Sequence, residues 1–222
     1  MRKKPSISIQ KKRAQVVMRE LDRLYGRKKM ETPLAYSSDI DLLVAVILSA
    51  QSTDSSVNKL TERLFKTYRT VTDYATGSTR ALAQDISSIN YYKTKAAHIR
   101  ESAKIIIRDH GGKVPGTMDE LLKLPGVGRK TAGVILGHLF GVYESIVVDT
   151  HVIRLSRKFG LTKHTAANAI ELELMELIPK KRWWDIAYKL KLYGREFSPA
   201  RRGYDDPIFL KLVSLGLMHE KC

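Results

Sequence analysis

Residues 124–141, LPGVGRKTAGVILGHLFG, join two helical patterns through a glycine turn. Gly126 and Gly128 allow backbone dihedrals and close approaches that a Cβ atom would forbid. The second helix begins with backbone N–H groups that have no partner inside the helix. These amides, the helix dipole and the basic pair Arg129-Lys130 favour an anion such as a phosphate oxygen. The stretch therefore predicts a phosphate-binding hairpin, and the alternative is an ordinary helical corner in a core.

The charge balance indicates an anionic partner. Lys and Arg number 39 against 23 acidic residues, and the formal net charge is +16. Nucleic acids and anionic membrane surfaces both attract such a protein. The longest apolar run, Leu42–Leu48, has seven residues, whereas a bilayer span needs about 20. The N-terminus lacks the apolar segment of a secretory signal. We therefore expect nucleic acid as the partner, no membrane helix and a protein inside the cell.

Helical periodicity dominates the chain and predicts an all-α protein of some ten helices. DLLVAVILSA (41–50) is apolar on all faces, which is typical of a helix at the centre of a domain. Thr117-Met118-Asp119-Glu120 predicts a capping box, and Asp149 or Thr150 is expected to cap a helix that Gly160 ends. Further helices are expected at about 165–178, 182–194 and 206–217.

Several motifs together resemble the helix-hairpin-helix base-excision DNA glycosylases, and within them endonuclease III. LPGVGRKTA is followed, 19 residues after Lys130, by Asp149 in VDTHVIR. LSAQSTDSSVNK, INYYKTKAAHI and LYGREF extend the resemblance over nearly the whole chain. The resemblance implies two helical domains that flank a DNA-binding cleft. Residues 33–143 would form a six-helix barrel with the hairpin, and residues 1–32 and 144–222 would form the second domain.

Lys130 and Asp149 are the expected catalytic residues. Removal of a base from deoxyribose develops positive charge at C1′, so the reaction needs a nucleophile and a nearby anion. Lys130 must lose its proton, and the positive end of a helix beside Arg129 disfavours the charged amine. The amine would expel the base and form a Schiff base, and β-elimination would then break the strand. The resemblance implies that Asp149 assists this deprotonation and stabilises the sugar cation. The alternatives are a phosphate-binding lysine and a simple N-cap aspartate.

Other residues are expected to contact DNA because an extruded base leaves a hole in the duplex. By resemblance, Gln51 enters this gap, and Tyr91 takes the place of a wedge that is usually leucine, where its ring can stack on a base. The alternatives are a helix-terminal glutamine and a half-buried tyrosine. Asp54 either lines the pocket mouth or caps its helix.

The second domain contributes two of the expected contacts. Arg154 would meet a phosphate, while His151 either orients Asp149 or is an interior histidine. The basic run Arg2–Arg13 is expected to be a solvated arm that strengthens DNA binding. The full expected DNA-binding set is Gln51, Tyr91, Gly126, Val127, Gly128, Arg129, Thr131, His151 and Arg154.

The sequence departs from endonuclease III where four cysteines usually hold an iron–sulfur cluster. The approximate positions of these cysteines carry Ser198, Asp205, Ile208 and Ser214, and the single cysteine, Cys222, lies beyond them. A cluster needs four thiolates. We therefore expect no cofactor and no metal, and a short helix packed through apolar residues instead. Those residues are Ile208, Phe209, Leu210, Leu212, Val213 and Leu217.

The resemblance implies a glycosylase with abasic-site (AP) lyase activity that removes oxidised pyrimidines from damaged double-stranded DNA. Lys130 favours this reading, because monofunctional relatives lack a lysine there. The alternatives are a monofunctional or mismatch-directed glycosylase of the same superfamily, and a non-catalytic protein that binds damaged DNA. We expect a monomer in the cytoplasm, associated with the nucleoid.

Overall fold

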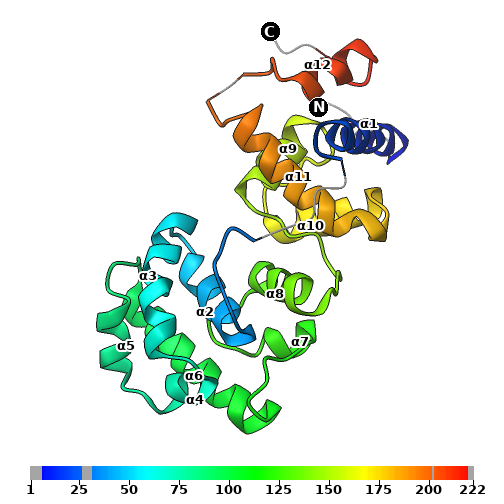
Figure 1. Ribbon diagram of the computed structural model, residues 1–222. Coiled ribbons are helices and arrows are strands. Elements are labelled where there is room, and N and C mark those ends of the chain that lie inside the picture. Colours follow the sequence, from blue (N-terminus) through cyan, green and yellow to red (C-terminus); the bar gives the residue numbers. More distant parts are fainter. Residues whose placement is uncertain (1–6, 27–31, 202, 220–222) are drawn as a thin grey trace. The chain divides into compact units, whose positions relative to one another are not determined.

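The computed structural model describes residues 7–26, 32–201 and 203–219 (Figure 1). All regular secondary structure in these residues is helical, so the all-α prediction is confirmed. The chain divides into two compact units. Unit 1 comprises Met1–Met30 and Tyr143–Cys222, and unit 2 comprises Glu31–Val142.

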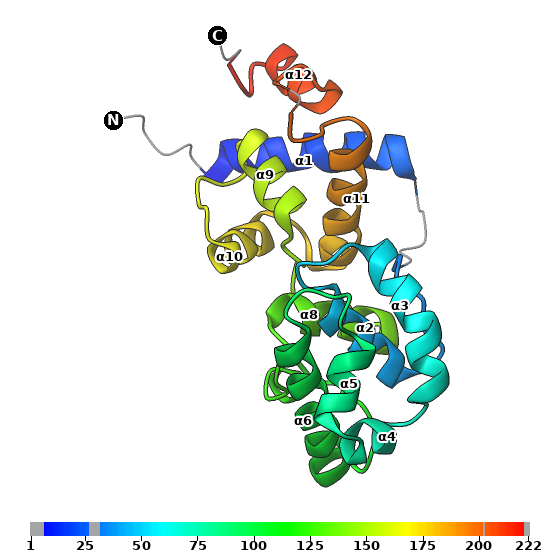
Figure 2. The ribbon, with the colours of Figure 1, turned by 90° about the vertical axis from the view of Figure 1, so that its left-hand side faces the viewer.

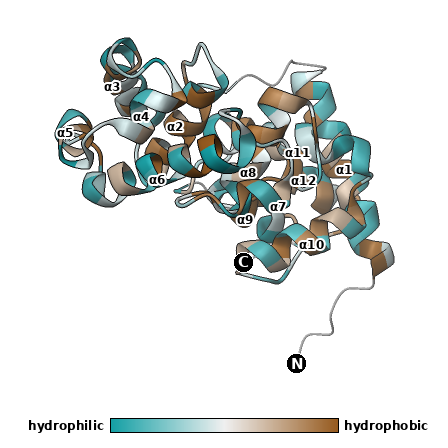
Figure 3. Cartoon of the chain, turned by 90° about the horizontal axis from the view of Figure 1, so that it is seen from below, coloured by the Kyte–Doolittle hydropathy of each residue, from teal (hydrophilic) through white to brown (hydrophobic). Residues whose placement is uncertain are grey.

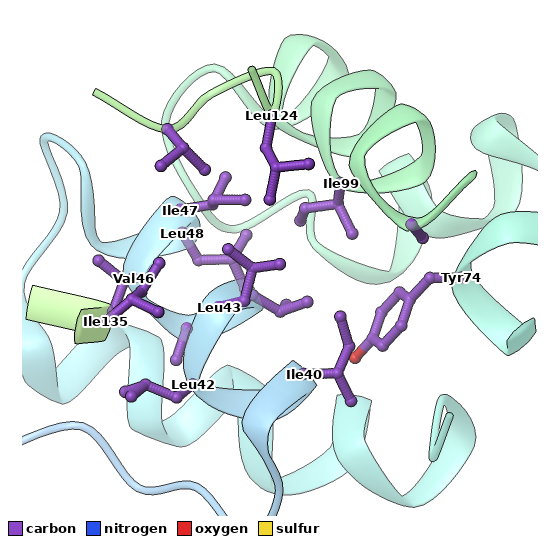
Figure 4. Close-up of a cluster of buried hydrophobic side chains, with 14 of the residues drawn as sticks. Ile40, Leu42, Leu43, Val46, Ile47, Leu48, Tyr74, Ile99, Leu124 and Ile135 are labelled. Atoms are coloured by element: carbon purple, nitrogen blue, oxygen red, sulfur yellow. The ribbon is translucent and has the colours of Figure 1, made fainter. Parts of the chain in front are cut away.

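Unit 2 is built around one buried helix, α2. Every residue of α2 from Ile40 to Leu48 is buried, as expected for a helix that is apolar on all faces. Figure 4 shows Tyr74, Ile99 and Leu124 pointing into the same cluster as the side chains of α2. The helices of unit 2 are α2 (Asp39–Ser49), α3 (Asp54–Thr67), α4 (Val71–Thr76), α5 (Thr79–Asp85), α6 (Tyr92–His110), α7 (Met118–Leu121), α8 (Arg129–Ile135) and the π-helix η1 (Leu136–Phe140).

Short capping motifs fix the starts of several helices in unit 2. Ser38 and Asp41 form a reciprocal capping box at the start of α2, and Thr70 and Asp73 form another at α4. α4 and α5 were not among the expected helices, because elements of one or two turns carry little periodicity. Both helices pack on α6, and their buried side chains belong to the same core as those of α2.

Unit 1 gathers helices from both ends of the chain. Figures 1 and 2 show α1 beside α11, and the two helices are in contact. The turns of α1 alternate between hydrophobic and hydrophilic residues in Figure 3, and Val17 and Leu21 enter the core beside Leu155 and Phe209. The helices of unit 1 are α1 (Ile7–Tyr25), α9 (Thr150–Lys158), α10 (Ala167–Leu177), the 3-10 helix η2 (Lys180–Arg182), α11 (Trp183–Glu196) and α12 (Pro207–Ser214).

The expected basic arm is wrong for the residues from Ile7 onward. These residues form the start of α1, and Gln10 and Ala14 are buried. The Arg13 guanidinium donates to the carbonyls of Leu217 at 2.8 Å and Gly160 at 2.9 Å. Gln10 Nε2 also donates to the Leu161 carbonyl at 2.9 Å, so contacts within unit 1 fix this part of the run. The part of the run from Arg2 to Ser6 lies outside the described residues.

Candidate functional site

The glycine turn of unit 2 packs against α6. Gly126 has a left-handed backbone with φ of +80°, and a Cβ added there would lie 3.0 Å from His98 Nδ1. The Ser102 hydroxyl donates to the carbonyl of Pro125 at 3.0 Å. Val127 is buried and its N–H group donates to the Leu124 carbonyl at 3.1 Å. The turn therefore needs glycine for both its conformation and its contact with α6.

The start of α8 is open. Gly128 is the N-cap residue, and no side chain caps the helix there. A Cβ atom added to Gly128 would meet no atom within 4 Å. Arg129 and Lys130, the first two residues of α8, are exposed, and Thr131 is half-buried. Amides and cations thus share a surface that an anion can approach.

Asp149 is the N-cap of α9, which selects it over Thr150, the other cap that the sequence offered. Its Oδ1 atom accepts hydrogen bonds from the N–H groups of His151 and Val152, both at 2.9 Å. The helix therefore fixes the carboxylate through one oxygen and leaves Oδ2 outside the cap. Asp149 belongs to unit 1 and Lys130 belongs to unit 2. The two expected catalytic groups therefore come from different units.

His151 and Arg154 face α11 inside unit 1. A Cβ added to Gly194 would lie 2.5 Å from His151 Nδ1 and 3.2 Å from Arg154 Nη2, so α11 approaches α9 closely. His151 Nδ1 is buried and has no hydrogen-bond partner among the described residues. Burial lowers the pKa of His151, and the charge of Asp149 opposes this shift. Arg154 Nη2 donates to the Ser198 carbonyl at 2.6 Å, which gives Arg154 a bond within the fold. Its phosphate contact stays a prediction.

Gln51 and Tyr91 share an unusual backbone conformation. They are the two non-glycine residues with positive φ in the described chain, at 55° and 58°. Asn90 Nδ2 donates to the carbonyl of Gln51 at 2.9 Å, so the two loops are joined. Tyr91 is 65% exposed, so the half-buried alternative is wrong. Thr53 is the N-cap of α3, and Asp54 lies in the first turn of the same helix.

Lys95 was missed by the sequence analysis. It is buried in the first turns of α6. Its ammonium donates to the carbonyls of Leu48 at 2.8 Å and Ala50 at 2.6 Å, at the end of α2. Burial lowers the pKa of Lys95. The ammonium stabilises carbonyls that have no partner within α2.

The residues near the expected cluster position do not fit an iron–sulfur cluster. Lys158 forms an ion pair with Asp206, and its side chain is 8% exposed while that of Asp206 is fully buried. Lys158 also donates to the Ser198 hydroxyl at 3.0 Å, and the Tyr193 hydroxyl donates to Asp206 Oδ1 at 2.5 Å. These side chains supply no thiolate, and Cys222 lies outside the described residues.

The C-terminal helix α12 combines polar and apolar anchoring. Ile208, Phe209 and Leu212 are buried, as expected from the apolar pattern. Leu210 is 49% exposed and does not take part in the core. Asp206 caps the helix by accepting from the Phe209 N–H group at 3.1 Å. The expectation of apolar packing alone is therefore corrected, because a buried ion pair fixes the same helix.

The described residues contain no group of three or more His, Cys, Asp or Glu side chains able to hold a metal ion. Within the same part of the chain, no helix has both the length and the apolar character that crossing a bilayer requires.

Comparison with known proteins gives consistent matches. Residues 44–180 match the family described as HhH-GPD superfamily base excision DNA repair protein. The chain is similar to endonuclease III of Synechocystis sp., with 41% identity over 86% of this chain and 87% of that protein. It is also similar to endonuclease III of Bacillus subtilis, with 45% identity over 77% of this chain and 78% of that protein.

Two solved structures resemble the fold with a TM-score of 0.83. One is a trapped covalent intermediate of endonuclease III with DNA, described as an estranged-adenine complex, at 38% identity over 89% of this chain and 93% of that chain. The other is a non-covalent complex of endonuclease III with DNA, at 37% identity over 95% of both chains.

Proposed function

The chain belongs to the HhH-GPD superfamily of base excision DNA repair proteins and, within it, to the endonuclease III family, and we propose that Lys130 is the nucleophile of its DNA glycosylase and AP lyase reactions. The observation that carries this proposal is the placement of Lys130. It is exposed in the first turn of α8, directly after the open glycine turn. A lysine presented in this way can reach a sugar whose phosphates bind to the turn.

The proposed substrate is damaged double-stranded DNA that carries an oxidised pyrimidine. Phosphate oxygens would accept hydrogen bonds from the amides that follow Gly128, and Arg129 and Thr131 would add charge and a hydroxyl donor. The turn residues Gly126 and Val127 hold this surface in shape. Arg154 and His151 would contribute from unit 1.

The proposed reaction begins at the neutral amine of Lys130. Its lone pair forms a bond to C1′, while the bond from C1′ to the base breaks and the base leaves with that electron pair and takes up a proton. Loss of the amine proton and opening of the sugar ring give the Schiff base. Removal of a proton from C2′ then expels the phosphate on the 3′ side. Water finally releases the lysine.

Asp149 would supply the negative charge in this sequence of steps. Its carboxylate is fixed by two backbone amides through Oδ1, so Oδ2 is oriented without a further loss of side-chain freedom. We propose that it accepts the proton of Lys130 and stabilises the positive charge that develops at C1′. Gln51 and Tyr91 would fill the space that the extruded base leaves.

The test of Lys130 is borohydride trapping on damaged duplex DNA. Borohydride reduces the Schiff base and leaves the protein covalently attached to DNA. Lys130→Ala should abolish trapping and strand nicking at a preformed abasic site. Lys123→Ala, which removes another exposed lysine of unit 2, should trap as the natural protein does. Undiminished trapping by Lys130→Ala would remove this residue from the mechanism.

Assays of base release and of nicking at a preformed abasic site separate the alternative functions. A natural protein that releases the damaged base but leaves a preformed abasic site unbroken would be monofunctional. A protein that binds abasic DNA without either reaction would be a non-catalytic binding protein. A panel of duplexes, each with one lesion, tests the preference for oxidised pyrimidines.

We also propose that the protein works without an iron–sulfur cluster. The single cysteine of the sequence and the Lys158–Asp206 ion pair support this proposal, because a cluster needs four thiolates. A purified sample should be colourless and free of bound iron. Stoichiometric iron with the visible absorbance of a cluster would contradict it.

The proposed working state is a monomer on the nucleoid in the cytoplasm. A +16 charge favours contact with the DNA phosphate backbone over a wide surface. Sedimentation of the protein alone should give a monomer, and with a short damaged duplex it should give one copy for each lesion. A stable dimer in both samples would contradict the monomer.

A further inference from the structure

The left-handed backbone of Gln51 and Tyr91 is strained, so other contacts in the fold must stabilise it. Left-handed backbone is disfavoured for residues with a Cβ atom, and such outliers cluster at functional sites. Both side chains are exposed, so burial of these side chains does not account for the conformation. The contacts that hold it are made to the backbone: the carbonyls of Ala50, Gln51 and Tyr91 all accept hydrogen bonds.

Two neighbouring residues connect these strained positions. Asn90, directly before Tyr91, donates from its side chain to the Gln51 carbonyl at 2.9 Å. Lys95 forms hydrogen bonds through both its backbone and its side chain. Its backbone N–H group donates to the Tyr91 carbonyl at 3.0 Å, and its ammonium donates to the Ala50 carbonyl at 2.6 Å, directly before Gln51. One loop thus cannot shift without disturbing the other.

We propose that Asn90 and Lys95 are positioning residues that hold Gln51 and Tyr91 as a preformed pair, ready to enter the duplex as the damaged base leaves. This inference rests on the proposed DNA contacts of Gln51 and Tyr91. A pair that is already ordered loses little freedom on binding, so more of the contact energy is available to extrude the base. The positioning residues need not touch DNA to have this effect.

The proposal predicts a selective loss of activity. Asn90→Ala removes one hydrogen bond and should lower kcat/KM for excision from a damaged duplex about fivefold. Lys95→Met removes two bonds from a buried cation and should lower it about tenfold or more. Nicking at a preformed abasic site should fall less, because no base has to be unstacked there. The matched controls are Ser88→Ala in the same loop and Lys104→Met on the exposed face of α6.

A mutant cycle tests whether Asn90 acts through Gln51 and Tyr91. Asn90→Ala should have no further effect in a Gln51→Ala/Tyr91→Ala background, because both residues that it positions have lost their side chains. Additive losses would overturn the proposal. So would equal losses of excision and abasic-site nicking, since a general loss of structure lowers both. Asn90→Ala keeps the test valid if Lys95→Met fails to fold.

Failure of the proposed function gives a different result. If Gln51→Ala and Tyr91→Ala excise bases as the natural protein does, neither residue acts in the duplex, and the DNA contacts proposed above are wrong. If those two variants lose activity while Asn90→Ala and Lys95→Met match their controls, the contacts stand and the positioning role is refuted.

Discussion

Replacement of Lys158 by methionine tests what holds the C-terminal helix of unit 1. The ammonium of Lys158 forms an ion pair with Asp206, whose side chain is fully buried. Methionine has a similar length, so the variant removes the charge and keeps much of the packing. Asp206 would then be a buried carboxylate without its cation. Breaking a buried pair in this way costs about 3–5 kcal/mol.

The other bonds of Asp206 limit how far the structure can adapt. Tyr193 and the N–H group of Phe209 both bond to Oδ1 of Asp206, so the carboxylate cannot turn to solvent without loss of the α12 cap. Because each 1 kcal/mol shifts the midpoint of a domain of 150–250 residues by about 2–4 °C and that of a smaller domain by more, thermal unfolding of unit 1 should shift down by at least about 6 °C.

The tryptophans provide an assay that is specific to this unit. The sequence contains two tryptophans, Trp183 and Trp184, and both lie at the start of α11 in unit 1. A urea titration followed by tryptophan emission therefore reports on unit 1, and a lower midpoint at unchanged slope measures lost stability. Lys211→Met, an exposed lysine on α12, is the matched control.

Two results test whether the ion pair between Lys158 and Asp206 stabilises α12. The double variant Lys158→Met/Asp206→Asn should regain much of the lost stability, because a neutral amide can still accept the bonds from Tyr193 and Phe209. If Lys158→Met instead stays within about 0.5 kcal/mol of Lys211→Met, the size expected for a surface change, the ion pair does not stabilise α12 and the reasoning is refuted.

Three further changes test close contacts in the two units. Gly126→Ala should lower stability by about 1–2 kcal/mol, since φ is +80° there, and circular dichroism would measure it. Gly194→Ala should cost about 1–3 kcal/mol by overpacking against His151, as measured by tryptophan emission; no change would contradict the close approach of α9 and α11. Burial and Asp85 raise the pKa of Tyr68 from 10.0 to about 12, so its contribution is complete below pH 10 and is lost as pH rises through 12. Tyr68→Phe should flatten that fall in stability, and an unchanged slope would refute the shift.

Local signals in the sequence predicted the parts of the site that neighbouring residues determine. The glycine turn at Gly126, the helix start at Arg129 and the N-cap at Asp149 each depend on a few consecutive residues. The apolar run of α2 predicted a central helix for the same reason. α4 and α5 escaped prediction because short helices depend on packing against α6 more than on their own periodicity.

Contacts between distant residues could not be predicted in this way. Asn90 and Gln51 are 39 residues apart in the chain, and Lys95 bonds to carbonyls 45 and 47 residues earlier. Lys158 and Asp206 are a further case, because a lysine and an aspartate usually lie on the surface. Their burial depends on how α9 and α12 meet, which no local pattern records.

Lys95 nevertheless had a signal in the sequence that its charge obscured. The buried face of α6 contains Ala96, Ile99, Ala103 and Ile106, and Lys95 precedes Ile99 by four positions, on the same face. A lysine in an apolar stripe must place its ammonium against acceptors within the fold, because an unpaired buried charge is too costly. The pattern thus predicts that Lys95 has a polar partner. It does not identify the partner, because the acceptors are backbone carbonyls of α2, and every residue has such a carbonyl.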